Sequence, residues 1–242
     1  MKQEPKLELP EYIMRPGIRT TSSGALAKDR SPIINHEELK KHSFFDENRN
    51  DVFVETGTFY GHGVLSAIIA GCVDIHSIEI ENEFFGYTSC MLDLLAYHNA
   101  YNFGVEGIET YRNSDFYSIV FGDKLRVSLY RGDSCGVLPK VLQRIVVKST
   151  FWLDAHHSGD ETGVSEINGE FPIYKELEAI AGHNIKNHTI MIDDMAQFEK
   201  NFPGEFSKLK SILYSINEKY VITKKLKSND DHIMIAKVDE KD

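Results

Sequence analysis

The stretch from Val52 to Glu81, VFVETGTFYGHGVLSAIIAGCVDIHSIEIE, decides the fold that we expect for this chain. Its first residues, Val52–Val54, are β-branched or aromatic and predict a strand buried on both faces. A turn with three glycines follows, and then an apolar helical segment from Val64 to Ala70. A second strand is expected from Val73 to Ile80. This order of strand, glycine turn, helix and strand is half of a nucleotide-binding unit.

The chemistry of such a turn favours a nucleoside ligand. Glycine lets the backbone turn sharply and lets a ligand approach the main chain, while the N-terminus of the next helix offers free N–H groups. Glu79 ends the second strand 22 residues after Gly57, where an acid can accept hydrogen bonds from both ribose hydroxyls. Without this acid, a tight turn that binds nothing would be an equally good interpretation. With it, we favour an adenosine site.

Four motifs follow one another along the chain. The first is Glu55–Gly63, in which an acid precedes spaced glycines. The later ones lie at expected strand ends, at Gly132-Asp133-Ser134, Phe151–His156 and Ile190–Asp194. In type and order they resemble the motifs of class I S-adenosylmethionine-dependent methyltransferases, over about residues 51 to 238. One position departs from that pattern, because Phe59 stands where the family has the middle glycine of the turn.

The resemblance implies that the chain binds S-adenosylmethionine as a methyl donor. In the family, the position of Asp133 recognises the adenine: the acid accepts from the exocyclic amine, and the next backbone N–H donates to a ring nitrogen. Asp133 is also a suitable cap for the following helix, and the two roles are compatible. Aromatic side chains in the turn are expected to border the sulfonium, whose charge is attracted to a ring face. The expected cofactor-binding residues are Glu55, Thr56, Gly57, Tyr60, Gly61, Gly63, Glu79, Ile80, Asp133 and Ser134.

The rest of the chain predicts an α/β fold. We expect a Rossmann-like, mostly parallel, seven-stranded sheet with helices on both faces and a C-terminal antiparallel hairpin. The expected strands are Val52–Val54, Val73–Ile80, Leu125–Tyr130, Thr150–Leu153, Thr189–Ile192, Tyr220–Lys225 and His232–Val238. Residues 1–50 are expected to form an N-terminal arm or flap, and residues 51–242 the methyltransferase domain. An aromatic-rich insertion is expected around residues 84–124. Such a density of aromatic residues is typical of protein cores and of subunit interfaces, so a homo-oligomer is one of the two interpretations.

The composition is that of a soluble globular protein, with 41% hydrophobic and 26% charged residues. The net charge of −10 argues against a nucleic-acid partner, since phosphate contacts need a basic surface. No run of 18 apolar residues predicts a membrane span, and the N-terminus lacks the order of a signal peptide. The three cysteines have no paired spacing and are expected to be reduced thiols, which favours a cytoplasmic location.

Three acids predict a metal site at the strand ends. Asp154 follows the fourth expected strand, and Asp193 and Asp194 follow the fifth. Neighbouring strands lie about 4.8 Å apart, so these carboxylates would crowd together and raise one another's pKa values. A divalent cation resolves this repulsion, and all-oxygen ligation suits Mg²⁺, with Mn²⁺ or Ca²⁺ as alternatives. The same set resembles the metal ligands of divalent-cation-dependent O-methyltransferases. The alternative interpretation is that one or two of the acids cap helices or turns.

Two histidines next to Asp154 are candidates for the catalytic base. Methyl transfer to an alcohol requires loss of the hydroxyl proton, which a metal and a nearby imidazole promote. Among the O-methyltransferases that this chain resembles, those acting on macrolide sugars have a histidine just after the acid of the fourth strand. We therefore favour His156 over His157 as the base, and we count Asp154 as a catalytic residue as well. Resemblance to methyltransferases associated with surface glycans makes a sugar or glycan the first expectation for the acceptor, with another small molecule as the alternative.

Two other functions compete with this interpretation. Asp154-Ala155-His156 resembles part of an arginase-type binuclear centre, so a metal-dependent hydrolase using Asp154, His156, Asp193 and Asp194 is the main alternative. That family has a further acid at the position of Ser158, and an adenosine site would serve no purpose in it. A binding protein that lost its chemistry is the other alternative, and the intact set of acids argues against it.

Overall fold

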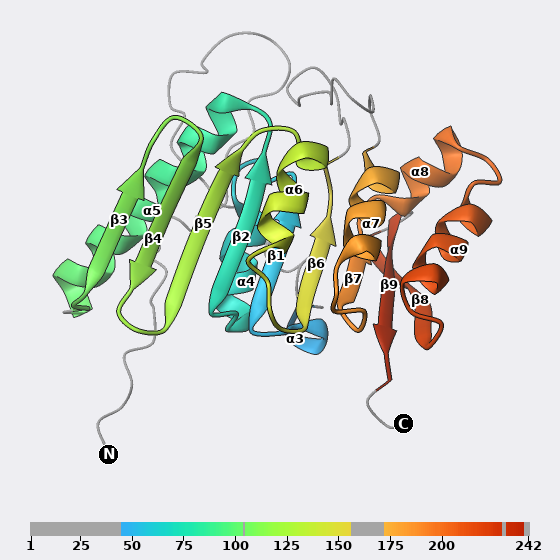
Figure 1. The fold of residues 1–242 in the computed structure, drawn as a ribbon. Helices are drawn as coiled ribbons and strands as arrows, with labels where there is room; N and C mark the ends of the chain where they lie inside the picture. Colours follow the sequence, from blue (N-terminus) through green and yellow to red (C-terminus); the bar gives the residue numbers. More distant parts are fainter. Residues whose placement is uncertain (1–44, 104, 156–171, 229–230, 240–242) are drawn as a thin grey trace, which may run out of the picture.

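The computed structural model describes residues 45–103, 105–155, 172–228 and 231–239. These residues form one nine-stranded sheet in the order β3-β4-β5-β2-β1-β6-β7-β9-β8 (Figure 1). The strands are β1 Val52–Thr56, β2 Asp74–Glu79, β3 Ile108–Arg112, β4 Phe116–Phe121, β5 Leu125–Arg131, β6 Ser149–Leu153, β7 Thr189–Ile192, β8 Tyr220–Ser228 and β9 Asp231–Val238. The described helices are α3 Phe45–Asn48, α4 His62–Ala70, α5 Asn82–Phe103, α6 Ser134–Leu142, α7 Ile173–Gly182, α8 Met195–Asn201 and α9 Phe206–Ile216.

Five strands in the middle of the sheet run parallel. β1 pairs with β2 on one side and with β6 on the other, β5 continues beyond β2, and β7 continues beyond β6. The chain therefore extends in opposite directions from β1, which creates a switch point between β1 and β6. In open α/β sheets, ligands bind at such a point, outside the carboxyl ends of the strands. All five carboxyl ends lie along the upper edge of the sheet in Figure 1.

Helices cover both faces of the sheet, which explains why β1, β6 and β7 are buried along their whole length. Every residue of β1 is buried. Phe53 belongs to the core shared with α3, α4 and α5, whereas Val52 and Val54 belong to the core shared with α6, α7 and α9. A strand that is buried on both faces has no solvent side on which polar residues can alternate. The expected α/β architecture with helices on both faces is therefore confirmed.

The expected number of seven strands is wrong. All seven expected strands are present, including the antiparallel hairpin of β8 and β9, but β3 and β4 add a second antiparallel hairpin at the edge of β5. These two strands come from residues that we expected to form an insertion. The signal was available, because five of the six residues FYSIVF of β4 are aromatic or β-branched and Gly122 follows them.

The helix between β5 and β6, α6, begins at Ser134 and contains Pro139. The carboxylate of Asp133 accepts a hydrogen bond from the N–H of Cys135 at 2.9 Å and so caps the start of this helix. The helix after β2, α5, extends over 22 residues. Within the described part of the chain, no helix combines the length and the apolar character that a membrane crossing requires.

Only the end of the expected N-terminal arm can be compared with the structure. Residues 45–50 pack against the sheet through α3, where Phe45 is buried against Phe53 and Trp152 with ring centroids 5.0 and 5.1 Å away. The remainder of the arm lies outside the described residues.

Candidate active site at the carboxyl edge of the sheet

The turn between β1 and α4 keeps a glycine-like path although Phe59 stands at its middle. Phe59 has φ = 48°, between Gly57 at 82° and Gly61 at 79°. A phenylalanine in this left-handed region is strained. Its environment holds it there: its ring packs on Tyr60 and Phe84, with centroids 4.3 and 4.6 Å away. The replacement of the middle glycine therefore changes the side chain of the turn and not its course.

The glycines of the turn are required by internal packing. A Cβ on Gly57 would lie 2.5 Å from the carbonyl oxygen of Asp154, and a Cβ on Gly63 would lie 1.6 Å from Oε1 of Glu55. Neither distance is possible without a rearrangement of neighbouring groups. The close fit of β1, α4 and the end of β6 thus accounts for these glycines even without a ligand, so the argument for a nucleoside site depends on the surrounding acids.

Glu79 lies beneath the turn with its carboxylate facing the backbone. Oε2 accepts a hydrogen bond from the N–H of Phe59 at 2.8 Å, and Oε1 accepts one from the N–H of Glu81 at 2.7 Å. Burial raises the pKa of Glu79, and these two N–H donors partly oppose that rise. Each carboxylate oxygen has two lone pairs, so both can accept a further hydrogen bond from a ligand. Ile80, the next residue, is half-buried at the same strand end.

Glu55 is a buried acid on the neighbouring strand. Its Oε2 accepts a hydrogen bond from the hydroxyl of Ser77 at 2.6 Å, and the Ser77 hydroxyl lies 2.5 Å from that of Thr58. Burial raises the pKa of Glu55 well above its usual range, and the charges of Asp154 and Glu79 add to this effect. Glu55 therefore favours the neutral carboxylic acid and supports the turn from below.

Asp133 follows β5, one strand beyond β2. As the cap of α6, it fulfils the structural role considered above, and one of its oxygens is engaged by Cys135. The N–H of Gly132 donates to the carbonyl of Glu79 at 2.7 Å, which fixes the end of β5 beside the end of β2. The structure thus brings Glu79, Asp133 and Ser134 to adjacent positions on the sheet edge.

A fourth acid, Glu176 on α7, was not predicted. It is 1% exposed, and its carboxyl group hydrogen-bonds with Ser134 and Thr56, so it connects α7 to the ends of β1 and β5. Burial raises the pKa of Glu176 to about 7. The signal for it was the apolar stripe of α7, because Glu176 lies one turn from both Ile173 and Ile180 on the buried face of that helix.

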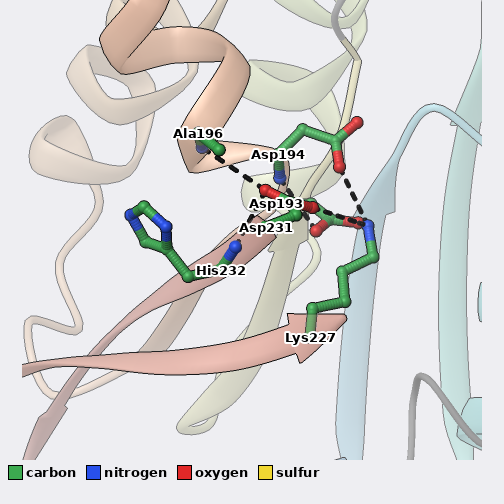
Figure 2. A network of polar contacts seen from close by, with 6 residues as sticks. All are labelled: Asp193, Asp194, Ala196, Lys227, Asp231 and His232. Carbon is green, nitrogen blue, oxygen red and sulfur yellow. Dashed lines mark hydrogen bonds and ion pairs between the residues drawn. The ribbon is translucent and has the colours of Figure 1, made fainter. Parts of the chain in front are cut away.

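The acids after β7 form a cluster around a lysine (Figure 2). Nζ of Lys227 lies 2.6 Å from Oδ2 of Asp193, 2.9 Å from Oδ1 of Asp194 and 3.6 Å from Oδ2 of Asp231. One oxygen from each of the three aspartates lies within 4.8 Å of the other two, a spacing that suits a metal ion. Asp154 lies outside this group, so the expected metal set of Asp154, Asp193 and Asp194 is not assembled as such.

Electrostatics within the cluster favour a charged lysine. Burial alone would lower the pKa of Lys227, but Asp193 and Asp194 outweigh burial and raise it. Burial and the charge of Asp154 raise the pKa of Asp193, an effect that Lys227 opposes. Lys227 and Asp231 were missed because they flank the β8–β9 hairpin, where polar residues are typical of a turn.

A hollow lies between the ends of β6 and β7 and the helices α7 and α8. Its walls are apolar, with Leu153, Ile173, Ile192 and Phe198, and its polar lining comes from the acids Glu176, Asp193 and Asp194. The expected bases His156 and His157 lie outside the described residues, as does Ser158. Asp154 is placed by its N–H, which donates to the carbonyl of Thr56 at 3.1 Å.

Comparison with known proteins adds fold likeness only. No family model matches the sequence, and no curated protein matches it. Among solved structures, the O-methyltransferase TomG from Streptomyces achromogenes, in complex with S-adenosylmethionine, is 12% identical over 86% of this chain and 82% of its own, with a TM-score of 0.48. An O-methyltransferase from Bacillus cereus, in complex with S-adenosylhomocysteine, is 10% identical over 85% and 82%, with a TM-score of 0.49. Because likeness at this level does not indicate an activity, the function must be argued from the site.

Proposed function

We propose that this protein is an S-adenosylmethionine-dependent methyltransferase that acts on a hydroxyl group of a sugar or another small polar acceptor. The observation that carries the proposal is the set of acids along three adjacent strands at the switch point. Glu55 lies under the turn after β1, Glu79 ends β2 and Asp133 follows β5. A nucleoside laid across these ends would meet Glu79 with its ribose and Asp133 with its base.

Each group would have a defined role in binding the cofactor. Glu79 would accept hydrogen bonds from the ribose hydroxyls, through lone pairs other than those that accept from the N–H groups of Phe59 and Glu81. A carboxylate oxygen of Asp133 would accept a hydrogen bond from the adenine amine, and the N–H of Ser134 would donate to a ring nitrogen. The remaining predicted contacts would come from Thr56, Gly57, Tyr60, Gly61, Gly63 and Ile80.

The chemistry needs little more than orientation. S-adenosylmethionine supplies a methyl group on a positively charged sulfur; the acceptor oxygen attacks the methyl carbon as the carbon–sulfur bond breaks, leaving a neutral thioether. The acceptor proton must leave, and His156 or His157, next to Asp154, are the proposed proton acceptors. Alignment of the two reactants accounts for most of the rate gain in such a reaction.

We further propose that a divalent cation assists the acceptor side. Asp193 and Asp194 would hold it, with Asp154 from the neighbouring strand or Asp231 from β9, since carboxylate oxygens suit Mg²⁺. Lys227 already lies against these carboxylates, so the ion must displace its ammonium group. The metal-dependent hydrolase has no support, because the described residues offer a single acidic cluster, whereas a binuclear centre needs ligands for two ions.

Calorimetric titration of S-adenosylmethionine into the purified protein tests the proposal, first in EDTA and then with Mg²⁺. We expect saturable one-site binding in both buffers, because the cation is placed on the acceptor side. Glu79→Gln should weaken binding at least tenfold, since hydrogen bonds to a charged acceptor contribute about 1.5–3 kcal/mol each. Glu81→Gln is the matched control, two residues away, and should bind normally. The proposal would be overturned if the wild-type protein bound S-adenosylmethionine neither in EDTA nor with Mg²⁺.

A cytoplasmic location accompanies this proposal, and the free thiols of Cys72, Cys90 and Cys135 support it.

A further inference from the structure

Glu176 is anomalous among the buried acids at the sheet edge. Ser134 and Thr56 hydrogen-bond to its carboxyl group, yet Oε1 is fully buried and has no hydrogen-bond partner among the described residues. A buried polar atom without a partner is costly, and in a native protein it calls for an explanation such as a bound ligand or water molecule. The side chain lines the hollow between β6, β7, α7 and α8.

The charges around the hollow restrict what can enter it. Its described polar lining consists of Glu176, Asp193 and Asp194, and none of the described lining residues is basic. Lys227 already donates to both aspartates, whereas the groups that hydrogen-bond to Glu176 in the described part of the chain are the uncharged Ser134 and Thr56. Burial is the main cause that raises the pKa of Glu176; hydrogen bonds from Ser134 and Thr56 oppose the rise, and the negative charges of Asp133 and Asp154 add to it.

We infer that Glu176 recognises the methyl acceptor, and that the part of the acceptor in this hollow carries hydroxyl or amino donors and no anionic group. This inference rests on the proposed methyltransferase function. A donor from the ligand would satisfy Oε1, and a positive charge on that donor would be attracted to the carboxylate. The apolar walls formed by Leu153, Ile173 and Phe198 would contact the carbon skeleton of the ligand. A carboxylate or phosphate group would instead be repelled, and its desolvation would not be compensated.

The test uses glucose and two sugars that each differ from it in one group: glucosamine, with an amine at C2, and glucuronate, with a carboxylate at C6. Saturation-transfer NMR would measure their binding at millimolar concentration to the full-length protein saturated with S-adenosylhomocysteine. We expect glucosamine to bind best, glucose more weakly and glucuronate not at all. In Glu176→Gln, which keeps the side-chain volume but not the charge, glucosamine should lose about tenfold in affinity and its advantage over glucose. Glu178→Gln, an exposed acid on the same helix, is the control and should bind like the wild type.

The outcomes separate this inference from the function on which it rests. If the wild-type protein does not bind S-adenosylhomocysteine in calorimetry, the methyltransferase proposal itself fails. If it does bind, the inference is overturned when glucuronate binds as well as the other two sugars, or when none of the three sugars binds. It is also overturned when Glu176→Gln binds the sugars like the wild type, which is the result expected if Oε1 binds only a water molecule. If Glu176→Gln does not fold, the ranking of the three sugars on the wild-type protein decides.

Discussion

At the scale of single residues, Lys227 is the side chain that most changes the picture drawn from the sequence. The sequence predicts the repulsion among the acids after β6 and β7, but it does not predict what relieves it. Lys227 lies 33 to 34 residues beyond Asp193 and Asp194 in the chain, and only the pairing of β9 with β7 brings the β8–β9 hairpin next to them. A relation of that kind depends on tertiary structure and leaves no local pattern.

The metal proposal therefore becomes a competition between Lys227 and a dication. In Lys227→Met, three carboxyl groups lose their ammonium, so we expect the thermal stability to fall in EDTA and to recover with Mn²⁺, because a ligand of the native state stabilises it. Mn²⁺ should bind the variant at least tenfold more tightly than the wild-type protein in calorimetry. Lys225→Met removes an exposed lysine of the same strand and should leave both properties unchanged. Equal Mn²⁺ affinity in wild type and Lys227→Met would contradict a shared site.

At the scale of elements, the turn between β1 and α4 shows what a motif does and does not establish. Its glycines were read as space for a ligand, yet Gly57 and Gly63 are required by their contacts with Asp154 and Glu55. The strand–turn–helix arrangement was nevertheless predictable, because the packing that requires these glycines belongs to the same fold. The conformation of Phe59 was not predictable, since a phenylalanine ordinarily avoids positive φ.

Two substitutions at residue 59 isolate the strain of this turn. Phe59→Gly and Phe59→Ala both remove the ring and its contacts with Tyr60 and Phe84, and they differ in how readily the backbone adopts φ = 48°. We expect the glycine variant to be more stable than the alanine variant by about 1 kcal/mol, because a left-handed conformation costs alanine about that much. Urea unfolding of the two variants measures the difference. If the alanine variant were the more stable of the two, as is usual where φ is negative, the turn would not be strained.

At the scale of the whole molecule, the sequence predicts the alternation of strands and helices, the parallel centre of the sheet and the edge at which the acids gather. The β3–β4 hairpin was missed, because the six residues FYSIVF of β4 do not alternate between apolar and polar types and lie in a segment dense in aromatic residues. Nor does the sequence predict Glu176, because an acid on an amphipathic helix is ordinarily assigned to the solvent side, and its burial depends on how α7 packs against α6 and the sheet. Burial of an acid at such a place has a consequence for the stability of the entire fold.

Glu176 should make the protein less stable as the pH rises from about 5 to 8. Its pKa is raised from 4.5 to about 7, with burial as the main cause. Below pH 4.5 both the folded and the unfolded chain hold the proton; above it the unfolded chain releases the proton first, so stability falls until about pH 7 and is constant beyond. The glutamine of Glu176→Gln does not ionise, so its stability relative to wild type should increase by about 2 kcal/mol between pH 5 and pH 8 in urea unfolding. Glu178→Gln, which changes an exposed acid, should show no such trend. A pH-independent difference between Glu176→Gln and wild type would mean that Glu176 keeps an ordinary pKa, and that the carboxyl group is better solvated than its burial between α7 and β1 implies.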